Sequence, residues 1–531
     1  MDLKEITPLI QSLPASRQWN RIGIKHHHGI SVPLFSLHSE QSGGIGEYLD
    51  LDGIIDWCGD LKLDIIQLLP LNDNGRESSP YSAISAFALN PIHLSLHALP
   101  GWEKISSLKA IYESLKSLNS KPRVDYNTIF TLKEDFLRKY FAVTAAECLN
   151  SPAFHEFKAS AHWLEKYAVF KTLKIKTHWI SWSLWPEKWK YPQETDIAAL
   201  IKELPQEIEF HQFVQFHCFN QFSNVHQRAE KRGVRLKGDI PILLSYESAD
   251  VWGNQSLFKL NYSAGAPPDM FNPDGQDWGF PLYNWEEIEK QNYSWWKDRL
   301  QTAARCYSLY RLDHIVGFYR IFARNLAHPN ATKGFIPEDS KAWITHGEKI
   351  LKALIASTDM LPIGEDLGVV PPEVRQNLRS LGICGTKVMR WERKWHEDSC
   401  YIPFSDYEPL SMTTVSTHDS ETLQIWWKLE TLEVQEFAKF KKWNYNSELT
   451  KEQHYEILFD SHHTASLFHI NLLQEYLALV PGRTWEDPLD ERINVPGTVS
   501  DRNWSYKFRP SVEEIVSDLE LKRIMTAMIR T

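Results

Sequence analysis

Short, continuously apolar segments recur along the chain and are separated by stretches with helical periodicity. Such segments lie at 64–71, 306–310 and 360–363, and residues 51–58 are apolar at helical spacing. Strands that are buried on both faces of a parallel sheet have this continuous apolar pattern. A strand, a helix and a second strand in succession form a βαβ unit. The expected fold class is therefore α/β, a (β/α)8 TIM barrel with large insertions that form helical subdomains and an active-site lid.

The length and the local composition predict how the chain is organised around the barrel. At about 150 residues for each domain, 531 residues would suggest three or four domains, but barrel domains often exceed that size. We expect residues 1–531 to form one barrel domain. Residues approximately 100–230 have helical periodicity and predict a mainly helical insertion. Residues approximately 252–285 mix Gly, Pro and aromatic residues, which predicts a long ordered loop that acts as a lid.

Charge and cysteine content exclude several classes of function. The net charge is -10 and no basic run is present, so we expect no nucleic-acid partner. We also expect no membrane span and no signal peptide, because long apolar stretches and a signal-like start are lacking. The six cysteines show no CxxC spacing, which predicts reduced thiols in a cytoplasmic protein and no zinc site. The oligomeric state stays open.

Two motifs suggest ligand binding but have simpler interpretations. Three consecutive histidines, His26 to His28, lack a nearby carboxylate or cysteine that would complete a metal site. We interpret them as a loop before the first strand. The glycine cluster at 43–46 lacks both the Lys-Ser/Thr of a P-loop and the G-x-G-x-x-G spacing, which favours a turn.

The aromatic content is a weak indication of carbohydrate binding, because the chain has 21 Trp and 20 Tyr residues, whose flat apolar faces can stack on sugar rings. The Trp cluster at 179–189 is nevertheless better explained as part of the core.

Three of the predicted strands end in an acidic residue: Asp313, Glu365 and Asp419. Each acid alone could belong to a structural ion pair that caps a strand. In a parallel barrel, however, the carboxyl ends of the strands meet on one face. Three acids at equivalent places therefore favour one site over three separate ion pairs. Paired carboxylates are the groups that cleave glycosidic bonds, one as nucleophile and the other as acid and base.

Polar neighbours of these acids fit the same site. Arg311 lies two residues before Asp313 and, by strand alternation, points to the same face, where it would keep that acid ionised. His418 adjoins Asp419 and could donate to a sugar hydroxyl. Asp239 lies within an apolar strand and therefore needs a partner.

Eight motifs occur in a fixed order along nearly the whole chain: SPYS at 79–82, GDIPI at 238–242, AGAPPD at 264–269, DGQDWGFPLYNWE at 274–286, RLDHIVGF at 311–318, GEDLG at 364–368, STHD at 416–419 and RINVPG at 492–497. On these motifs the sequence resembles the 4-α-glucanotransferases of glycoside hydrolase family 77, the amylomaltases or disproportionating enzymes. GFPLYNW resembles the branch that includes the plant cytosolic disproportionating enzyme.

The resemblance implies a retaining transfer of an α-1,4-glucan segment to the 4-hydroxyl of an acceptor, with no metal and no cofactor, in glycogen and maltodextrin metabolism. Its implied partners are maltooligosaccharides, glycogen or starch-derived dextrins. It implies that Asp313 is the nucleophile, Glu365 the general acid/base and Asp419 the transition-state stabiliser. The substrate-binding residues that it implies are Tyr81, Asp239, Asp269, Gln276, Trp278, Arg311, His418 and Asn494.

Two positions depart from the family pattern. Phe280 and Ser420 stand where many members have Asn, which leaves acceptor preference open. Two other classes of function also stay open. A plain α-glucan hydrolase would use the same acids, and a non-catalytic glucan-binding protein is disfavoured because all three acids are present.

Overall fold

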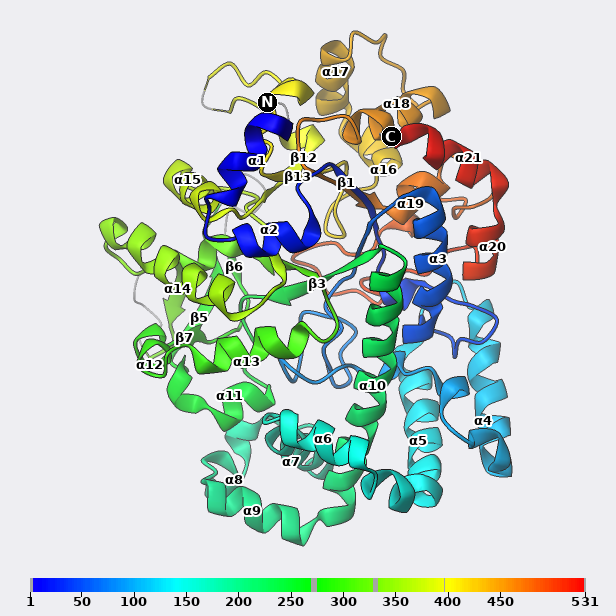
Figure 1. Ribbon diagram of the computed structural model, residues 1–531, viewed down its shortest axis with the longest axis vertical. Coiled ribbons are helices and arrows are strands. Elements are labelled where there is room, and N and C mark those ends of the chain that lie inside the picture. The colour runs from blue at the N-terminus through cyan, green and yellow to red at the C-terminus, as the bar shows by residue number, and fades with distance from the viewer. Residues whose placement is uncertain (1–2, 269–274, 328–332, 396, 530–531) are drawn as a thin grey trace.

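A computed structural model describes residues 3–268, 275–327, 333–395 and 397–529. Among them, eight parallel strands form one sheet with neighbours in chain order (Figure 1). A parallel bridge between Ile363 and Cys384 joins the two ends of the sheet and so closes it. The predicted (β/α)8 barrel is confirmed. Its strands are β1 (His27–Ser31), β2 (Ile65–Gln67), β3 (Arg235–Pro241), β8 (Leu309–Asp313), β11 (Leu361–Gly364), β12 (Gly385–Val388), β13 (Ser411–Thr414) and β14 (Phe468–Leu472).

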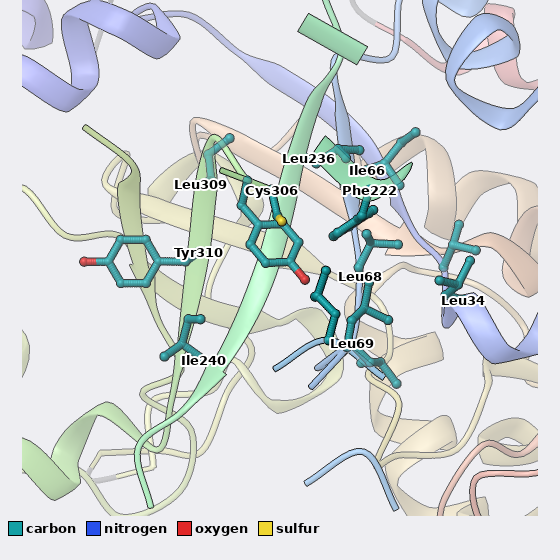
Figure 2. Close-up of a cluster of buried hydrophobic side chains, with 14 of the residues drawn as sticks. Leu34, Ile66, Leu68, Leu69, Phe222, Leu236, Ile240, Cys306, Leu309 and Tyr310 are labelled. Atoms are coloured by element: carbon teal, nitrogen blue, oxygen red, sulfur yellow. The ribbon is translucent and has the colours of Figure 1, made fainter. Parts of the chain in front are cut away.

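Helices surround the barrel, and several of them pack buried apolar side chains against the strands. Figure 2 shows one such contact, where Phe222 of α10 (Pro205–Lys231) lies among side chains from β2 and β3, including Ile66 and Leu236. The helices outside the insertion are α1 (Leu3–Gln11), α2 (Ser16–Ile22), α3 (Leu51–Leu61), α11 (Ala249–Gly253), α12 (Trp285–Lys290), α13 (Ser294–Ala303), α14 (Trp343–Ser357), α15 (Pro372–Leu381), α16 (Leu423–Leu429), α17 (Thr431–Phe440), α18 (Lys451–Ser461), α19 (Leu473–Leu477), α20 (Val512–Ser517) and α21 (Leu519–Met528). None of the described helices is long and apolar enough to cross a membrane.

Between β2 and β3 the chain forms a run of helices on one side of the barrel (Figure 1). Trp182 and Trp185 from the aromatic cluster are buried, and Trp182 stacks on Tyr246 with ring centroids 4.8 Å apart. These two rings are therefore core residues. The helices are α4 (Ser106–Ser117), α5 (Tyr126–Leu149), α6 (Pro152–Ser160), α7 (Leu164–Lys176), α8 (Glu187–Lys190), α9 (Glu194–Glu203) and α10 (Pro205–Lys231).

The stretch that we interpreted as one long loop, residues 252–285, contains short strands, so that part of the prediction was wrong. These strands are β4 (Phe258–Lys259), β5 (Tyr262–Ala266), β6 (Gln276–Asp277) and β7 (Leu282–Tyr283). β5 pairs antiparallel with β6 and with β9 (Ile321–Asn325), and β9 pairs with β10 (Gly334–Ile336). The partner strand lies far along the chain, so local composition does not reveal the pairing.

The interpretation of His26 to His28 as a loop holds for His26 but was wrong for His27 and His28, which belong to β1. His27 stacks on Phe468 of the neighbouring strand at 4.7 Å, and its Nδ1 lies 2.8 Å from the Asp64 carboxylate. Parallel pairing with β14 includes both histidines and so extends the strand to these polar residues, whereas pairing with β2 begins at Gly29. Across the described ranges, no group of three or more His, Cys, Asp or Glu residues is arranged to hold a metal ion.

A buried ion pair joins the helical insertion to the barrel. Lys133 of α5 contacts the Glu47 carboxylate at 2.5 Å, and both side chains are almost inaccessible, with 3% and 0% exposed. The same ammonium donates to two backbone carbonyls, those of Ile92 and Leu94.

Lys133→Met should lower the free energy of unfolding by about 3–5 kcal/mol, because it leaves a buried carboxylate without its partner. Urea denaturation at neutral pH measures this loss. The matched control is Lys139→Met on the same helix, which removes an exposed ion pair with Asp135 and should cost at most about 1 kcal/mol. Equal losses in the two variants would contradict a structural role for the buried pair.

Candidate active site

Arg311 joins carboxylates from three neighbouring strands at the C-terminal end of the barrel. Alternation along β8 places Arg311 and Asp313 on the same side, and the register pairs Asp239 with Arg311. Arg311 Nη1 donates to both carboxylate oxygens of Asp239, at 3.0 and 2.8 Å, and lies 2.8 Å from Asp313 Oδ1. Arg311 Nη2 lies 4.0 Å from Glu365 Oε2. One guanidinium group therefore holds these three acids together.

Glu365 follows the last residue of β11 and accepts two backbone hydrogen bonds. Its Oε1 accepts from the N–H of Leu367 at 2.8 Å, and its Oε2 accepts from the N–H of His314 at 2.9 Å. Burial raises the pKa of Glu365 to about 7; Arg311 opposes this shift, whereas the charge of Asp313 adds to it. This carboxyl can therefore hold a proton at neutral pH and release it, as a general acid and base must.

His314 connects the acids to the lid residues. It has a left-handed backbone with φ of 49°, which is unusual for a residue other than glycine, and its N–H donates to Glu365. The Trp278 ring meets the His314 ring edge to face at 5.0 Å. Trp278 Nε1 in turn donates to Gln276 Oε1 at 2.8 Å. The predicted lid residues Gln276 and Trp278 thus lie beside the catalytic strand, and Asp269 lies outside the described residues.

Tyr81 closes the opposite side of the site. Its hydroxyl donates to Asp239 Oδ2 at 2.8 Å and lies 2.9 Å from His418 Nε2. The Tyr81 and His418 rings stack with centroids 5.6 Å apart and an interplanar angle of 20°. A flat aromatic wall of this kind offers an apolar face to a sugar ring.

Asp419 lies in a turn beyond β13, with its side chain part exposed. His418 Nε2 is 3.3 Å from Asp419 Oδ2, and Asn494 Nδ2 donates to Oδ1 at 2.7 Å. Burial alone would raise the pKa of Asp419, but His418 and Asn494 outweigh it and hold that pKa below its ordinary value. Burial likewise opposes protonation of His418, but the Asp419 carboxylate outweighs it and raises the pKa of His418. Asp419 is therefore ionised under conditions in which Glu365 is protonated.

The strand that we predicted to run to Asp419 ends earlier, at Thr414. Ser420, one of the two unusual positions, accepts a hydrogen bond from the Thr417 N–H at 2.9 Å and so closes the turn that carries His418 and Asp419. Side-chain hydroxyls often close turns in this way. The strand therefore stops before the motif at 416–419 that was predicted to end it.

Trp504 is a site residue that the sequence analysis missed. Its ring lies 5.5 Å from Tyr81 and 5.9 Å from His418, so it completes the aromatic wall. Trp504 follows the last of the eight motifs, at 492–497, and the chain returns to the site there. A non-glycine residue with a positive φ, 61° at Trp504, marks this return in the structure, but it leaves no sequence signal.

Comparison with known proteins decides the family. The family model described as 4-alpha-glucanotransferase matches residues 32–513. A 4-alpha-glucanotransferase from Chlamydia muridarum is 41% identical over 98% of each chain. This chain belongs to the 4-alpha-glucanotransferase family. A second relative with that name, from Chlamydia pneumoniae, is 43% identical over 94% of this chain and 95% of its own.

The plant branch is related more distantly, and a solved structure matches the fold. The rice 4-alpha-glucanotransferase DPE2 is 26% identical over 94% of this chain and 69% of its own. An amylomaltase from Streptococcus agalactiae, solved with acarbose, superimposes with a TM-score of 0.80 at 23% identity, covering 95% of this chain and 98% of its own. At that identity the match supports the (β/α)8 fold and carries no further conclusion.

Proposed function

We propose that this chain is a retaining 4-α-glucanotransferase, which moves a segment of an α-1,4-glucan to the 4-hydroxyl of an acceptor glucose or glucan. The observation that most strongly supports this reaction is the group of acids around Arg311. Asp313 lies at the end of β8, and Glu365, which can be protonated, lies beside it. Family membership supports the reaction. The acarbose bound to the Streptococcus agalactiae amylomaltase supports a glucan-like ligand.

In the first step, Asp313 attacks the anomeric carbon of the donor sugar. The bond to the leaving 4-oxygen breaks, and Glu365 gives that oxygen its proton. The product is a β-linked glycosyl-enzyme and a shortened glucan with a free 4-hydroxyl. We assign to Asp419, kept ionised by His418 and Asn494, the stabilisation of the positive charge that develops on the donor ring.

In the second step, the acceptor 4-hydroxyl attacks the glycosyl-enzyme and gives its proton to Glu365. Asp313 leaves as a carboxylate, and the new bond is α-linked because two inversions restore the original configuration. Glu365 returns to its protonated state and is ready for the next donor. The backbone hydrogen bonds from His314 and Leu367 fix its position through both steps.

The remaining residues bind the two sugars. Tyr81 and His418 line the donor side, with Asp239 and Asn494 behind them as hydrogen-bond partners. Gln276 and Trp278 cover the acceptor side, and we assign Asp269 to the same lid. Transfer exceeds hydrolysis only when such a lid keeps water from the glycosyl-enzyme while the acceptor is bound.

The proposed setting follows from the same chemistry. No step above requires a metal or a cofactor, and the partners are maltooligosaccharides, glycogen or starch-derived dextrins. The six cysteines are all free thiols, which supports a reducing compartment, and we propose the cytoplasm. We also propose that residues 1–531 form a single catalytic domain, with the helices between β2 and β3 as an insertion and residues 252–285 as the lid.

Incubation of the protein with maltotriose alone tests this function. We expect a ladder of longer maltooligosaccharides together with glucose or maltose, while the number of reducing ends stays constant. A rise in reducing ends without a ladder would make the protein a hydrolase and direct attention to the lid at Phe280. If maltotriose stays unchanged, the remaining interpretation is a glucan-binding protein without catalytic activity.

A further inference from the structure

A buried lysine crosses the interior of the barrel directly below the catalytic residues. Lys237 is on β3, two residues before Asp239, and strand alternation points both side chains into the barrel. Leu236 and Ile240, the alternate residues, belong to the apolar cluster on the other face of the strand (Figure 2). Lys237 is 0% exposed.

The Lys237 side chain reaches the far wall. Its Nζ donates to Gln67 Oε1 of β2 at 2.6 Å and lies 3.0 Å from Met412 Sδ of β13. In the strand order, β13 is four strands from β3 in either direction around the closed barrel. The side chain therefore joins the strand that carries Asp239 to the strand that leads into Asp419, in the layer below the site.

The surroundings of this lysine are unusual because its contacts are uncharged. Within the described residues it forms no ion pair, and an isolated buried ammonium is costly. Burial lowers the pKa of Lys237 to about 7, Arg311 of β8 adds to that shift, and Asp239 of β3 and the Cys384 thiol oppose it. In mildly acidic solution the ammonium is therefore present. An apolar residue of similar length would fill the same space without this cost.

The charge balance of the site gives the lysine a role. When Glu365 is protonated, three other acids, Asp239, Asp313 and Asp419, still face Arg311 and His418 as their cations. Burial raises the pKa of Asp239 although Arg311 opposes the shift, and the nearby Asp313 charge raises it further. An additional positive charge from below offsets this accumulation of negative charge.

We propose that Lys237 is a positioning residue of this active site: its ammonium, held across the barrel by Gln67 and Met412, favours the ionised form of Asp239, the carboxylate that holds Arg311 beside Asp313. The inference rests on the proposed transferase function. In this role Lys237 does not contact the substrate. Its charge acts through the low-dielectric barrel interior, where Coulomb interactions are stronger than in water.

The test is the pH profile of kcat/KM for maltotriose disproportionation by Lys237→Met, which removes the charge and keeps the length. The acidic limb is the low-pH side of this profile, where kcat/KM falls as the pH is lowered. We expect this limb to shift to higher pH by about 0.5–1 unit. At a given pH on the limb, kcat/KM should therefore fall by roughly three- to tenfold. Gln67→Glu offers a second route, because a new carboxylate neutralises the ammonium while the lysine stays in place. Its acidic limb should move in the same direction.

Lys507→Met is the matched control. Lys507 is also a buried lysine; among the described residues its ammonium donates to uncharged groups, the carbonyls of Leu118 and Asn119, and it lies outside the carboxylate array. This control should alter stability without moving the acidic limb. If Lys237→Met and Gln67→Glu change the unfolding temperature but leave the limb in place, the lysine is only a structural brace and the proposal is overturned. The wild-type product ladder tests the transferase function itself, so the two failures are distinguishable.

Discussion

The variant Asp313→Asn should lose disproportionation of maltotriose, with kcat lower by on the order of 10⁴-fold or more. The amide has the shape of the carboxylate but cannot form the glycosyl-enzyme. Arg311 keeps both hydrogen bonds to Asp239, so the strand ends should stay in place. Initial rates of ladder formation measure the loss. Calorimetric titration with a longer maltooligosaccharide should show that binding persists.

The control for this variant is Asp359→Asn. Asp359 is an exposed acid whose ion pair with Arg17 lies away from the site, with 59% of its side chain accessible. Its kcat should equal that of the wild type. Retained transfer in Asp313→Asn, with the substitution verified by mass, would remove Asp313 from the role of nucleophile. Loss of both transfer and binding would show that the substitution disrupts the site as a whole.

The barrel and its acids could be predicted because their causes are local. Strands buried on both faces must be continuously apolar, and a charge at the end of such a strand is conspicuous for that reason. Asp313 and Glu365 stand at or directly after their strand ends, as that pattern predicts. Because parallel strands share one C-terminal face, their convergence follows from the fold alone.

Other features depend on contacts between distant parts of the chain. The small sheet that contains Gln276 forms because β5 pairs with β9, more than fifty residues later, and no composition signal in 252–285 encodes that pairing. Trp504 joins Tyr81 from the C-terminal part of the chain. His28 lies in β1 because β14 pairs beside it and brings His462 within 2.9 Å. The sequence around such residues carries no signal of these contacts, so their positions are known only from the tertiary structure.

The pKa values of Glu365 and Asp419 are shifted in opposite directions, and the cause is the partners of each carboxyl. Glu365 is buried with two neutral N–H donors and only a distant contact to Arg311, so desolvation dominates. Asp419 has His418 and an Asn494 amide at hydrogen-bonding distance, so the ionised form wins although it too is desolvated. Environments that separate the pKa values of nearby acids in this way assign the acid and the charge stabiliser.

Glu365→Gln should therefore lower transfer from maltotriose by on the order of 10²–10⁴-fold, because the amide cannot protonate the leaving oxygen. The wild-type rate should fall as pH rises through about 7, where Glu365 loses the proton that it must donate. This alkaline limb should be absent in the variant. Steady-state rates between pH 5 and 9 would measure both effects, with the range set about the expected pKa.

The decisive substrate for this variant is α-glucosyl fluoride, because fluoride leaves without being protonated. Glu365→Gln should form the glycosyl-enzyme from it at a rate near that of the wild type, and the intermediate should then accumulate, since no base activates the acceptor. Glu289→Gln, at an exposed acid paired with Lys349, is the control and should behave as the wild type does with both substrates. If glucosyl fluoride were as poor a substrate as maltotriose, the defect would lie in the geometry of the Arg311 array, and Glu365 would not be the proton donor.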